Sequence, residues 1–391
     1  MNIVKSLAQR PLLAVAVMAG VLSAACVPIR QEASWPAVSI IGDEQDILVA
    51  YQDRVVLINP EDGTPVKLRN SDGEVRLDEE GNARVWEFTG PEGQSTQFYS
   101  TPAQLNDETL LIPSFNDLLF EVGLKTARAD KNAAGVALPG PVVSNPVLHD
   151  NRLYMGLSER ELVALSQDGT TVEWRFTTGH GVWSQPLIID NVLYFGSLDH
   201  FLYAVNATTG DELWKLDLQG AVTEAPAYYE GNLYVGSFAR KVLKISLDGE
   251  VLAEYKTNDW VWNTPSIVDG VLYAADMGGA VYALDISGRD FQQVWQAQVT
   301  NRAIRTTPLV KNEYVIVGSR DKKLYWLNRE DGSTFFSREL SDEALSDFLL
   351  IEPSDTVNLP EPIIVAGTPS TQELLVAFTL QSGERVWTYG R

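Results

Sequence analysis

The sequence predicts an all-β fold, an eight-bladed β-propeller with four antiparallel strands in each blade. A short pattern recurs about every 40 residues, in which a proline stands ten positions before the Gly or Ala that closes an apolar run. Examples of the run are Asn191-Val-Leu-Tyr-Phe-Gly-Ser197 and Asn232-Leu-Tyr-Val-Gly-Ser237. Apolar and polar residues then alternate around a Gly-containing turn, which is typical of short antiparallel strands. A unit of about 40 residues cannot bury both of its faces alone, so neighbouring units must stack, and a closed ring leaves few free sheet edges.

The position that closes the apolar run can be placed eight times along the chain. Successive intervals of 62, 44, 40, 40, 39, 43 and 49 residues show that the central units are regular and that the end units carry insertions. We expect the extra residues, 70–82 and 341–362, to form surface loops, where partner contacts tend to lie. The eight positions are Ala50, Ile112, Gly156, Gly196, Gly236, Ala275, Gly318 and Gly367.

Composition supports a folded chain and excludes some partners. Hydrophobic residues make up 45% of the 391 residues, which is ample material for a core. The formal net charge of −22 would repel phosphate backbones and anionic lipid surfaces, so nucleic acid is not expected as a partner. Turns are too frequent for a transmembrane β-barrel, whose strands need about ten residues. Any attachment to a membrane therefore has to come from an anchor.

The first 26 residues have the layout of an export signal that ends at the only cysteine. Two basic residues precede an apolar run from Leu12 to Leu22, and small residues then lead to Cys26. The run is shorter than the roughly 20 residues that a membrane-spanning helix needs. The end of the segment resembles a bacterial lipobox, although Leu22 stands four positions before the cysteine and the usual pattern has three. We expect lipidation of Cys26; the alternative is an ordinary signal peptide in which this cysteine is incidental.

These features predict three segments and an extracytoplasmic location. Residues 1–26 form the signal, 27–35 a short linker and 36–391 a single propeller. A lipid anchor would hold the protein at the periplasmic side of the outer membrane or at the outer face of the cytoplasmic membrane. The rest of the chain has no cysteine, which excludes disulfides and thiol catalysis there.

One segment carries a family resemblance. Ala204-Val-Asn-Ala-Thr-Thr-Gly-Asp-Glu-Leu-Trp214 resembles the tryptophan-docking repeat of PQQ-like propellers, the quinoprotein alcohol dehydrogenase-like family. Weaker copies end at Trp174, Trp295 and Trp387, and Phe336 replaces the tryptophan in the seventh unit. The resemblance implies that each tryptophan stacks on a glycine-containing turn of the next blade. Each ring would bury about 150–250 Å² there.

The same family includes enzymes that use pyrroloquinoline quinone (PQQ). Those enzymes generally have a vicinal cysteine pair over the quinone and bind calcium near a catalytic aspartate. Here the only cysteine belongs to the export signal, and the sequence offers no matching calcium loop. His149, His180 and His200 have no metal-ligand spacing. We therefore expect no catalytic residue, no metal and no cofactor, with a PQQ-dependent dehydrogenase as the alternative.

Tryptophans and basic residues of units four to seven are predicted to share one face. In a blade of this kind, the turn that enters the first strand and the turn between the second and third strands emerge on the same side. Trp and Arg are frequent anchors of protein interfaces, so we expect a protein or peptide partner on this face. The alternative is that the tryptophans fill the central channel and the arginines pair with nearby aspartates. The candidate residues are Trp183, Glu224, Trp260, Trp262, Arg302, Arg305, Arg240, Lys241 and Arg320.

Among PQQ-like propellers without the quinone, the chain is similar in signal, length and blade number to BamB-type lipoproteins. The resemblance implies a monomeric, non-catalytic protein-binding scaffold in envelope protein assembly. A convincing copy of that family's partner-binding loop is not found, so the expected role rests on likeness of fold. A ligand-sensing or solute-binding propeller is a further alternative.

Overall fold

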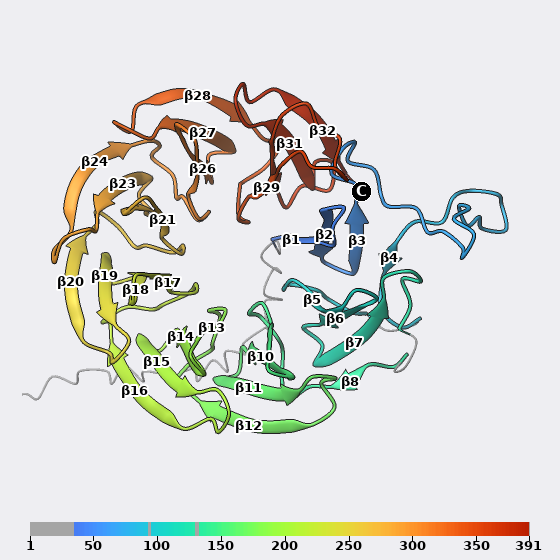
Figure 1. Ribbon diagram of the computed structural model, residues 1–391, viewed down its shortest axis with the longest axis horizontal. Coiled ribbons are helices and arrows are strands. Elements are labelled where there is room, and N and C mark those ends of the chain that lie inside the picture. The colour runs from blue at the N-terminus through green and yellow to red at the C-terminus, as the bar shows by residue number, and fades with distance from the viewer. Residues whose placement is uncertain (1–34, 93–94, 130–132, 391) are drawn as a thin grey trace, which may run out of the picture. The chain divides into compact units, whose positions relative to one another are not determined.

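Eight four-stranded antiparallel sheets surround a common axis. The computed structural model describes residues 35–92, 95–129 and 133–390, all of which belong to one compact unit, Ser34–Arg391. These residues form strands β1 to β32 and no helix (Figure 1). The eight-bladed propeller is confirmed. The described part of the chain contains no helix long and apolar enough to cross a membrane.

Each blade uses four consecutive strands, with the first nearest the axis. Blade 1 contains β1 (Ala37–Ile41), β2 (Asp46–Tyr51), β3 (Arg54–Ile58) and β4 (Glu87–Phe88). Blade 2 contains β5 (Ala103–Asn106), β6 (Thr109–Pro113), β7 (Leu118–Gly123) and β8 (Val136–Ala137). Blade 3 contains β9 (Val147–His149), β10 (Arg152–Gly156), β11 (Glu161–Ser166) and β12 (Val172–Thr177). Blade 4 contains β13 (Leu187–Ile189), β14 (Val192–Gly196), β15 (Phe201–Asn206) and β16 (Glu212–Asp217).

The second half of the ring repeats this order. Blade 5 contains β17 (Ala227–Tyr229), β18 (Asn232–Ser237), β19 (Lys241–Ser246) and β20 (Val251–Lys256). Blade 6 contains β21 (Ser266–Val268), β22 (Val271–Ala275), β23 (Ala280–Asp285) and β24 (Gln292–Gln298). Blade 7 contains β25 (Leu309–Lys311), β26 (Tyr314–Ser319), β27 (Lys323–Asn328) and β28 (Thr334–Glu339). Blade 8 contains β29 (Leu349–Ile351), β30 (Ile363–Gly367), β31 (Leu375–Thr379) and β32 (Arg385–Tyr389).

The position that recurs in the sequence lies in the second strand of every blade. It is Gly or Ala in all blades but blade 2, which has Ile112, and close packing explains why it is small. A Cβ atom on Gly196, at the end of β14, would overlap the side chain of Val222, which belongs to the turn entering blade 5. Gly236 meets Val261 in the same way one blade further on. The small residue therefore makes room for the entry turn of the next blade, which brings that turn to the axis.

Tryptophans of the outer strands join neighbouring blades. Trp214 in β16 lies against Gly249 of blade 5, where a Cβ would stand 2.7 Å from the indole. Its Nε1 donates a hydrogen bond to the Leu247 carbonyl at 2.9 Å. The predicted stacking is confirmed, because the same contact joins Trp174 to Gly210, Trp295 to Gly332 and Trp387 to Gly63.

Blades 7 and 8 use a variant of this contact. Phe336 lies against Gly383, and the hydrogen bond comes from Trp326, whose Nε1 donates to the Leu380 carbonyl at 2.9 Å. The two rings stack with centroids 5.0 Å apart. Two side chains thus supply the apolar contact and the hydrogen bond that one tryptophan supplies elsewhere.

The two insertions, which were expected to form surface loops, each contain further structure. Residues 70–82 belong to a protruding arm that backbone hydrogen bonds hold together. The amide of Leu68 donates to the carbonyl of Arg84, that of Arg84 donates to Arg76, and that of Arg76 donates to Leu68, each at 2.8 Å. Three chain segments therefore pair with one another outside the blade (Figure 1). Residues 341–362 fall on both sides of β29, so part of this insertion enters blade 8 at the axis.

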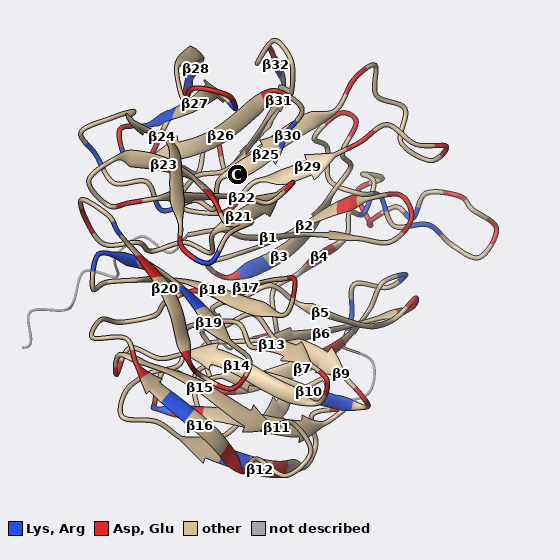
Figure 2. Cartoon of the chain, turned by 60° about the vertical axis from the view of Figure 1, so that its left-hand side comes forward, with Lys and Arg blue, Asp and Glu red and all other residues tan. Residues whose placement is uncertain are grey.

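Charged residues gather on loops and outer strands, whereas inner strands such as β14 carry none (Figure 2). In β16, acidic and basic residues alternate with apolar ones. The apolar side chains between adjacent sheets form the core clusters, for example Leu202, Leu233 and Val235 between blades 4 and 5.

We predict that Trp214→Ala lowers the free energy of unfolding by about 3–5 kcal/mol, because it removes a large, partly buried ring that joins two blades. The measurement is chemical or thermal denaturation followed by circular dichroism. Leu213→Ala is the matched control: this neighbour is 51% exposed, so its loss should cost less than about 0.5 kcal/mol. Equal stabilities of the two variants would contradict the assigned contact.

Alanine substitutions at two glycines can distinguish the energy of the tryptophan contact from the energy of backbone strain. Gly249 (φ +84°) and Gly231 (φ +78°) both have a left-handed backbone, but only Gly249 faces a tryptophan, and Gly231 has open space around it. We expect Gly231→Ala to cost about 1–2 kcal/mol from the backbone alone. Gly249→Ala should cost a further 1–3 kcal/mol or so, because Trp214 must move. Urea denaturation of both variants measures the difference in their free energies of unfolding. A difference near zero would mean that the Trp214 indole can move aside without loss of stability.

Candidate functional site

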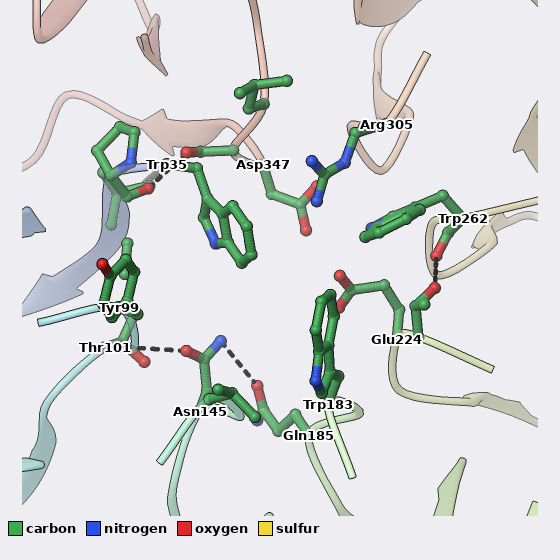
Figure 3. Close-up of a pocket in the computed structure, with 17 residues that line it drawn as sticks. Trp35, Tyr99, Thr101, Asn145, Trp183, Gln185, Glu224, Trp262, Arg305 and Asp347 are labelled. Atoms are coloured by element: carbon green, nitrogen blue, oxygen red, sulfur yellow. Dashed lines mark hydrogen bonds between the residues drawn. The ribbon is translucent and has the colours of Figure 1, made fainter. Parts of the chain in front are cut away.

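A cavity of about 160 Å³ lies at the axis, among the turns that enter the first strands of the blades (Figure 3). Its aromatic walls are Trp35, Trp183 and Trp262, and its charged residues are Glu224, Arg305 and Asp347. Asn145 and Gln185 add amide groups to the wall. Trp35, expected at the end of the linker, thus packs within the propeller. We call this space the axial cavity.

Backbone hydrogen bonds place the entry turns and the second turns of the blades on the same face. The Met277 amide donates to the Trp260 carbonyl at 2.8 Å, and the Phe238 amide donates to Ala221 at 3.0 Å. In blade 4, the Gly179 amide donates to the Asp199 carboxylate at 2.6 Å. Residues from both kinds of turn therefore lie close together in space.

Arg305 lies between two indoles. Its guanidinium carbon is 3.9 Å from the ring centroid of Trp262 and 5.0 Å from that of Trp35. Trp183 packs against both tryptophans, with centroid distances of 6.4 Å to Trp35 and 6.3 Å to Trp262. A cation over an aromatic face gains about 0.5–2 kcal/mol, and more as water is removed. One donor of the Arg305 side chain is unsatisfied, because its buried Nε has no hydrogen-bond partner among the described residues.

Two carboxyl groups share the cavity with Arg305. Burial raises the pKa of Glu224 to about 8, and the negative charge of Asp347 adds to the rise, while Arg305 opposes it. Burial also raises the pKa of Asp347, against hydrogen bonds from the Thr307 amide at 2.6 Å and its hydroxyl at 3.0 Å. By its exposed surface, the Glu224 residue is half-buried, and Asp347 is exposed to solvent through the cavity.

The pKa of Arg305 moves toward neutrality for the same reason. Burial lowers it to about 10, and the nearby charge of Arg320 lowers it further, while Glu224, Glu343 and Asp347 act in the opposite direction. Arg305 therefore stays cationic at neutral pH.

Hydrogen bonds between neighbouring entry turns fix the polar wall of the cavity. The Thr101 amide donates to Asn145 Oδ1 at 3.0 Å, and Asn145 Nδ2 donates to Gln185 Oε1 at 3.4 Å. Opposite them, the Thr223 hydroxyl donates to the Trp262 carbonyl at 2.8 Å. The wall is held by contacts between blades, so its shape depends on closure of the ring.

A second group of side chains lies on the same face, outside the cavity. Trp260 is 46% exposed and stacks on Phe238 with centroids 5.0 Å apart and planes 8° apart. A groove of about 680 Å³ lies next to Trp260, and its lining includes Met277, Arg302 and Arg320. We call this group the rim, comprising Phe238, Arg240, Trp260, Met277, Arg302, Arg320 and Lys322.

The sequence-predicted candidates divide between these two places. The axial cavity receives Trp183, Glu224, Trp262 and Arg305, and the rim receives Trp260, Arg240, Arg302 and Arg320. Lys241 lines neither the cavity nor the groove, and its ammonium pairs with Glu254 of the adjacent strand at 2.8 Å. The alternative expected from the sequence thus fits some of these residues. Trp183 and Trp262 lie in the central channel. Arg240 forms an ion pair with Asp259 at 3.7 Å, and Arg320 forms one with Glu343 at 2.8 Å.

Some members of both groups were not predicted. Trp35 stands directly before Pro36, whereas the other entry residues stand three positions before their prolines, and the spacing to the recurring small position is also longer in blade 1. Asp347 lies in the insertion 341–362, which hides the entry turn of blade 8. Phe238 follows the recurring Gly-Ser of blade 5, and only the structure brings it to Trp260.

Cys26 lies outside the described residues. Among the described residues, no group of three or more His, Cys, Asp or Glu side chains could hold a metal ion.

Comparison with known proteins identifies the family. The model of the family described as outer membrane protein assembly factor BamB matches residues 71–258 and 198–388. The BamB protein of Marinobacter adhaerens is 32% identical over 113 residues, which are 27% of this chain and 28% of the relative. That of Salmonella typhimurium is 33% identical over 91 residues, 21% of this chain and 23% of the relative. These matches span less than a third of either relative.

Solved structures show the same fold at low identity. The crystal structure of BamB from Moraxella catarrhalis has a TM-score of 0.58 and 14% identity, and covers 87% of this chain and 97% of that chain. The computationally designed protein Ika8 has a TM-score of 0.61 and 16% identity, and covers 86% and 95%. Because the family model covers most of the sequence and the strands form eight PQQ-like blades, the chain belongs to the outer membrane protein assembly factor BamB family.

Proposed function

We propose that the protein is a non-catalytic scaffold that binds protein partners through its rim, in the assembly of outer membrane proteins. In this proposal it is exported, anchored by lipid at Cys26, and acts as a monomer outside the cytoplasm. The observation that carries the proposal is the exposed stack of Trp260 on Phe238 beside a basic groove. Family membership supplies the biological setting.

The rim has the chemistry of an interface centre. A tryptophan that is 46% exposed offers a large apolar surface that a partner could cover, and its stack on Phe238 fixes its orientation before binding. The adjacent groove holds three basic side chains against two carboxylates, on a protein of net charge −22. A fitting partner segment therefore carries an apolar side chain for Trp260 and acidic residues for the groove.

We also propose that the protein works without PQQ. The axial cavity, at about 160 Å³, is smaller than the ~300–1,000 Å³ typical of ligand pockets. PQQ carries three carboxylates, which would face Glu224 and Asp347, and Arg305 is already engaged between two indoles. Both considerations support a role that rests on binding alone.

We predict that Trp260→Ala reduces recovery of envelope partners at least tenfold after mild detergent extraction and pull-down. A central tryptophan anchor is worth about 2–4 kcal/mol, and each 1.4 kcal/mol changes affinity about tenfold. Leu213→Ala is the matched control, since Leu213 is 51% exposed, close to the 46% of Trp260, but lies on the outer strand β16. Unchanged partners for Trp260→Ala, with an unchanged melting midpoint, would argue against the rim.

We predict that Cys26→Ser moves the protein from the membrane fraction to the soluble fraction, because the only lipid-accepting thiol is lost. Phase separation in detergent, followed by immunoblotting, measures the distribution. A variant that stays with the detergent phase would show that something other than lipid on this residue holds the protein.

A further inference from the structure

The axial cavity contains more negative than positive groups. Glu224 and Asp347 face a single cation, Arg305, in the lining of the cavity, and the charges of both carboxyl groups act on it. Figure 3 shows the three side chains directed into the same space. When both carboxyl groups are ionised, the cavity carries one uncompensated negative charge.

One aromatic wall of the cavity has no cation. Arg305 lies over the rings of Trp35 and Trp262, whereas no described Lys or Arg lies over Trp183. In Figure 3, the Trp183 indole projects into the cavity beside Glu224. An aromatic face next to a carboxylate attracts a cation through both the ring quadrupole and the charge.

We propose that the axial cavity binds one small organic cation, a guanidinium or alkylammonium group, between Trp183 and the carboxylates of Glu224 and Asp347. The protein already binds such a group in its own structure, since Arg305 lies between two indoles a short distance away. The site is separate from the rim and does not depend on the partner proposed there.

The size of the cavity limits the ligand to one head group. An engineered cavity of about 150 Å³ admits benzene, and this one measures about 160 Å³. A guanidinium with a short alkyl chain has a comparable volume. Asp347 is exposed to solvent, so the cavity is open to an entering ligand on its side.

Binding should depend on pH in a defined direction. With a pKa of about 8, raised by burial and by Asp347 against Arg305 and Trp262, Glu224 is mostly neutral at pH 6.5 and mostly ionised at pH 9. The other charged groups around Arg305 are Arg320 and Glu343. A cation binds about tenfold more tightly to the ionised carboxylate than to the neutral group, so its binding releases part of a proton near pH 7, and its affinity rises roughly sevenfold from pH 6.5 to 9.

The test uses n-propylguanidine as the probe and n-propylurea as an uncharged molecule of the same shape. Isothermal titration at pH 7, in two buffers of different ionisation enthalpy, measures affinity and proton release together. We expect saturable binding and proton release for propylguanidine only, with the expected rise in affinity at pH 9. Equal binding of propylurea, or an affinity independent of pH, would overturn the proposal.

Variants then locate the site. Glu224→Gln preserves shape and should lower the affinity at pH 9 about tenfold and abolish the pH dependence, whereas Glu250→Gln, on an exposed turn, should change neither. Trp183→Leu provides a second variant, with a loss of similar size. No effect of either cavity variant would place the bound cation elsewhere and contradict the proposal.

Two further experiments identify the source of the cation and distinguish this proposal from that of partner binding at the rim. A blocked pentapeptide with one arginine among glycines, compared with free propylguanidine, distinguishes a side chain of another protein from a soluble compound. Tighter binding of the peptide indicates the first source, and binding of propylguanidine alone indicates the second. Trp260→Ala should leave propylguanidine binding unchanged, because that residue lies on the rim.

Discussion

The contact between a tryptophan and a glycine turn of the next blade is the interaction on which the rest of this structure depends. Glycine is required because the turn has a left-handed backbone, with φ of +84° at Gly249, and because the indole leaves no room for a Cβ. The hydrogen bond from the indole Nε1 to a carbonyl of the same turn fixes the direction of approach. Together they set the position of one sheet against the next, and the entry turns at the axis follow from that position.

The axial cavity and the rim show how a repeated backbone carries varied chemistry. Equivalent positions in the entry turns of blades 4 to 7 supply Trp183, Thr223, Trp262 and Arg305. The backbone that presents them is nearly the same each time, because all four blades keep the strand pairing and the small residue in the second strand. Charge and shape at the axis can therefore change without altering the sheets. The chemistry of the site has to be argued from these side chains and not from the fold.

The blades could be predicted from the sequence because their signals are local. Alternation, turn glycines and the proline spacing all fall within one unit of about 40 residues, and the docking tryptophans lie 18 or 20 residues after the recurring small position. The site was predicted only in part. Trp183 and Arg305 belong to regular units, whereas Asp347 belongs to an insertion and Trp35 precedes the first strand. The distance between Glu224 and its charged neighbours depends on closure of the whole ring, which no local pattern encodes.

Closure through Trp387 and blade 1 has a consequence for how the chain folds. Most docking contacts join residues about 33 positions apart, as Trp214 and Leu247 do, whereas Trp387 and Pro60 are 327 positions apart. Bringing the distant pair together costs about 2 kcal/mol more in chain entropy, so single blades can form early and the ring closes late. Until then the apolar faces of blades 1 and 8 stay open to water and to other chains. A propeller of this kind is therefore most vulnerable to aggregation in the interval before its two end blades meet.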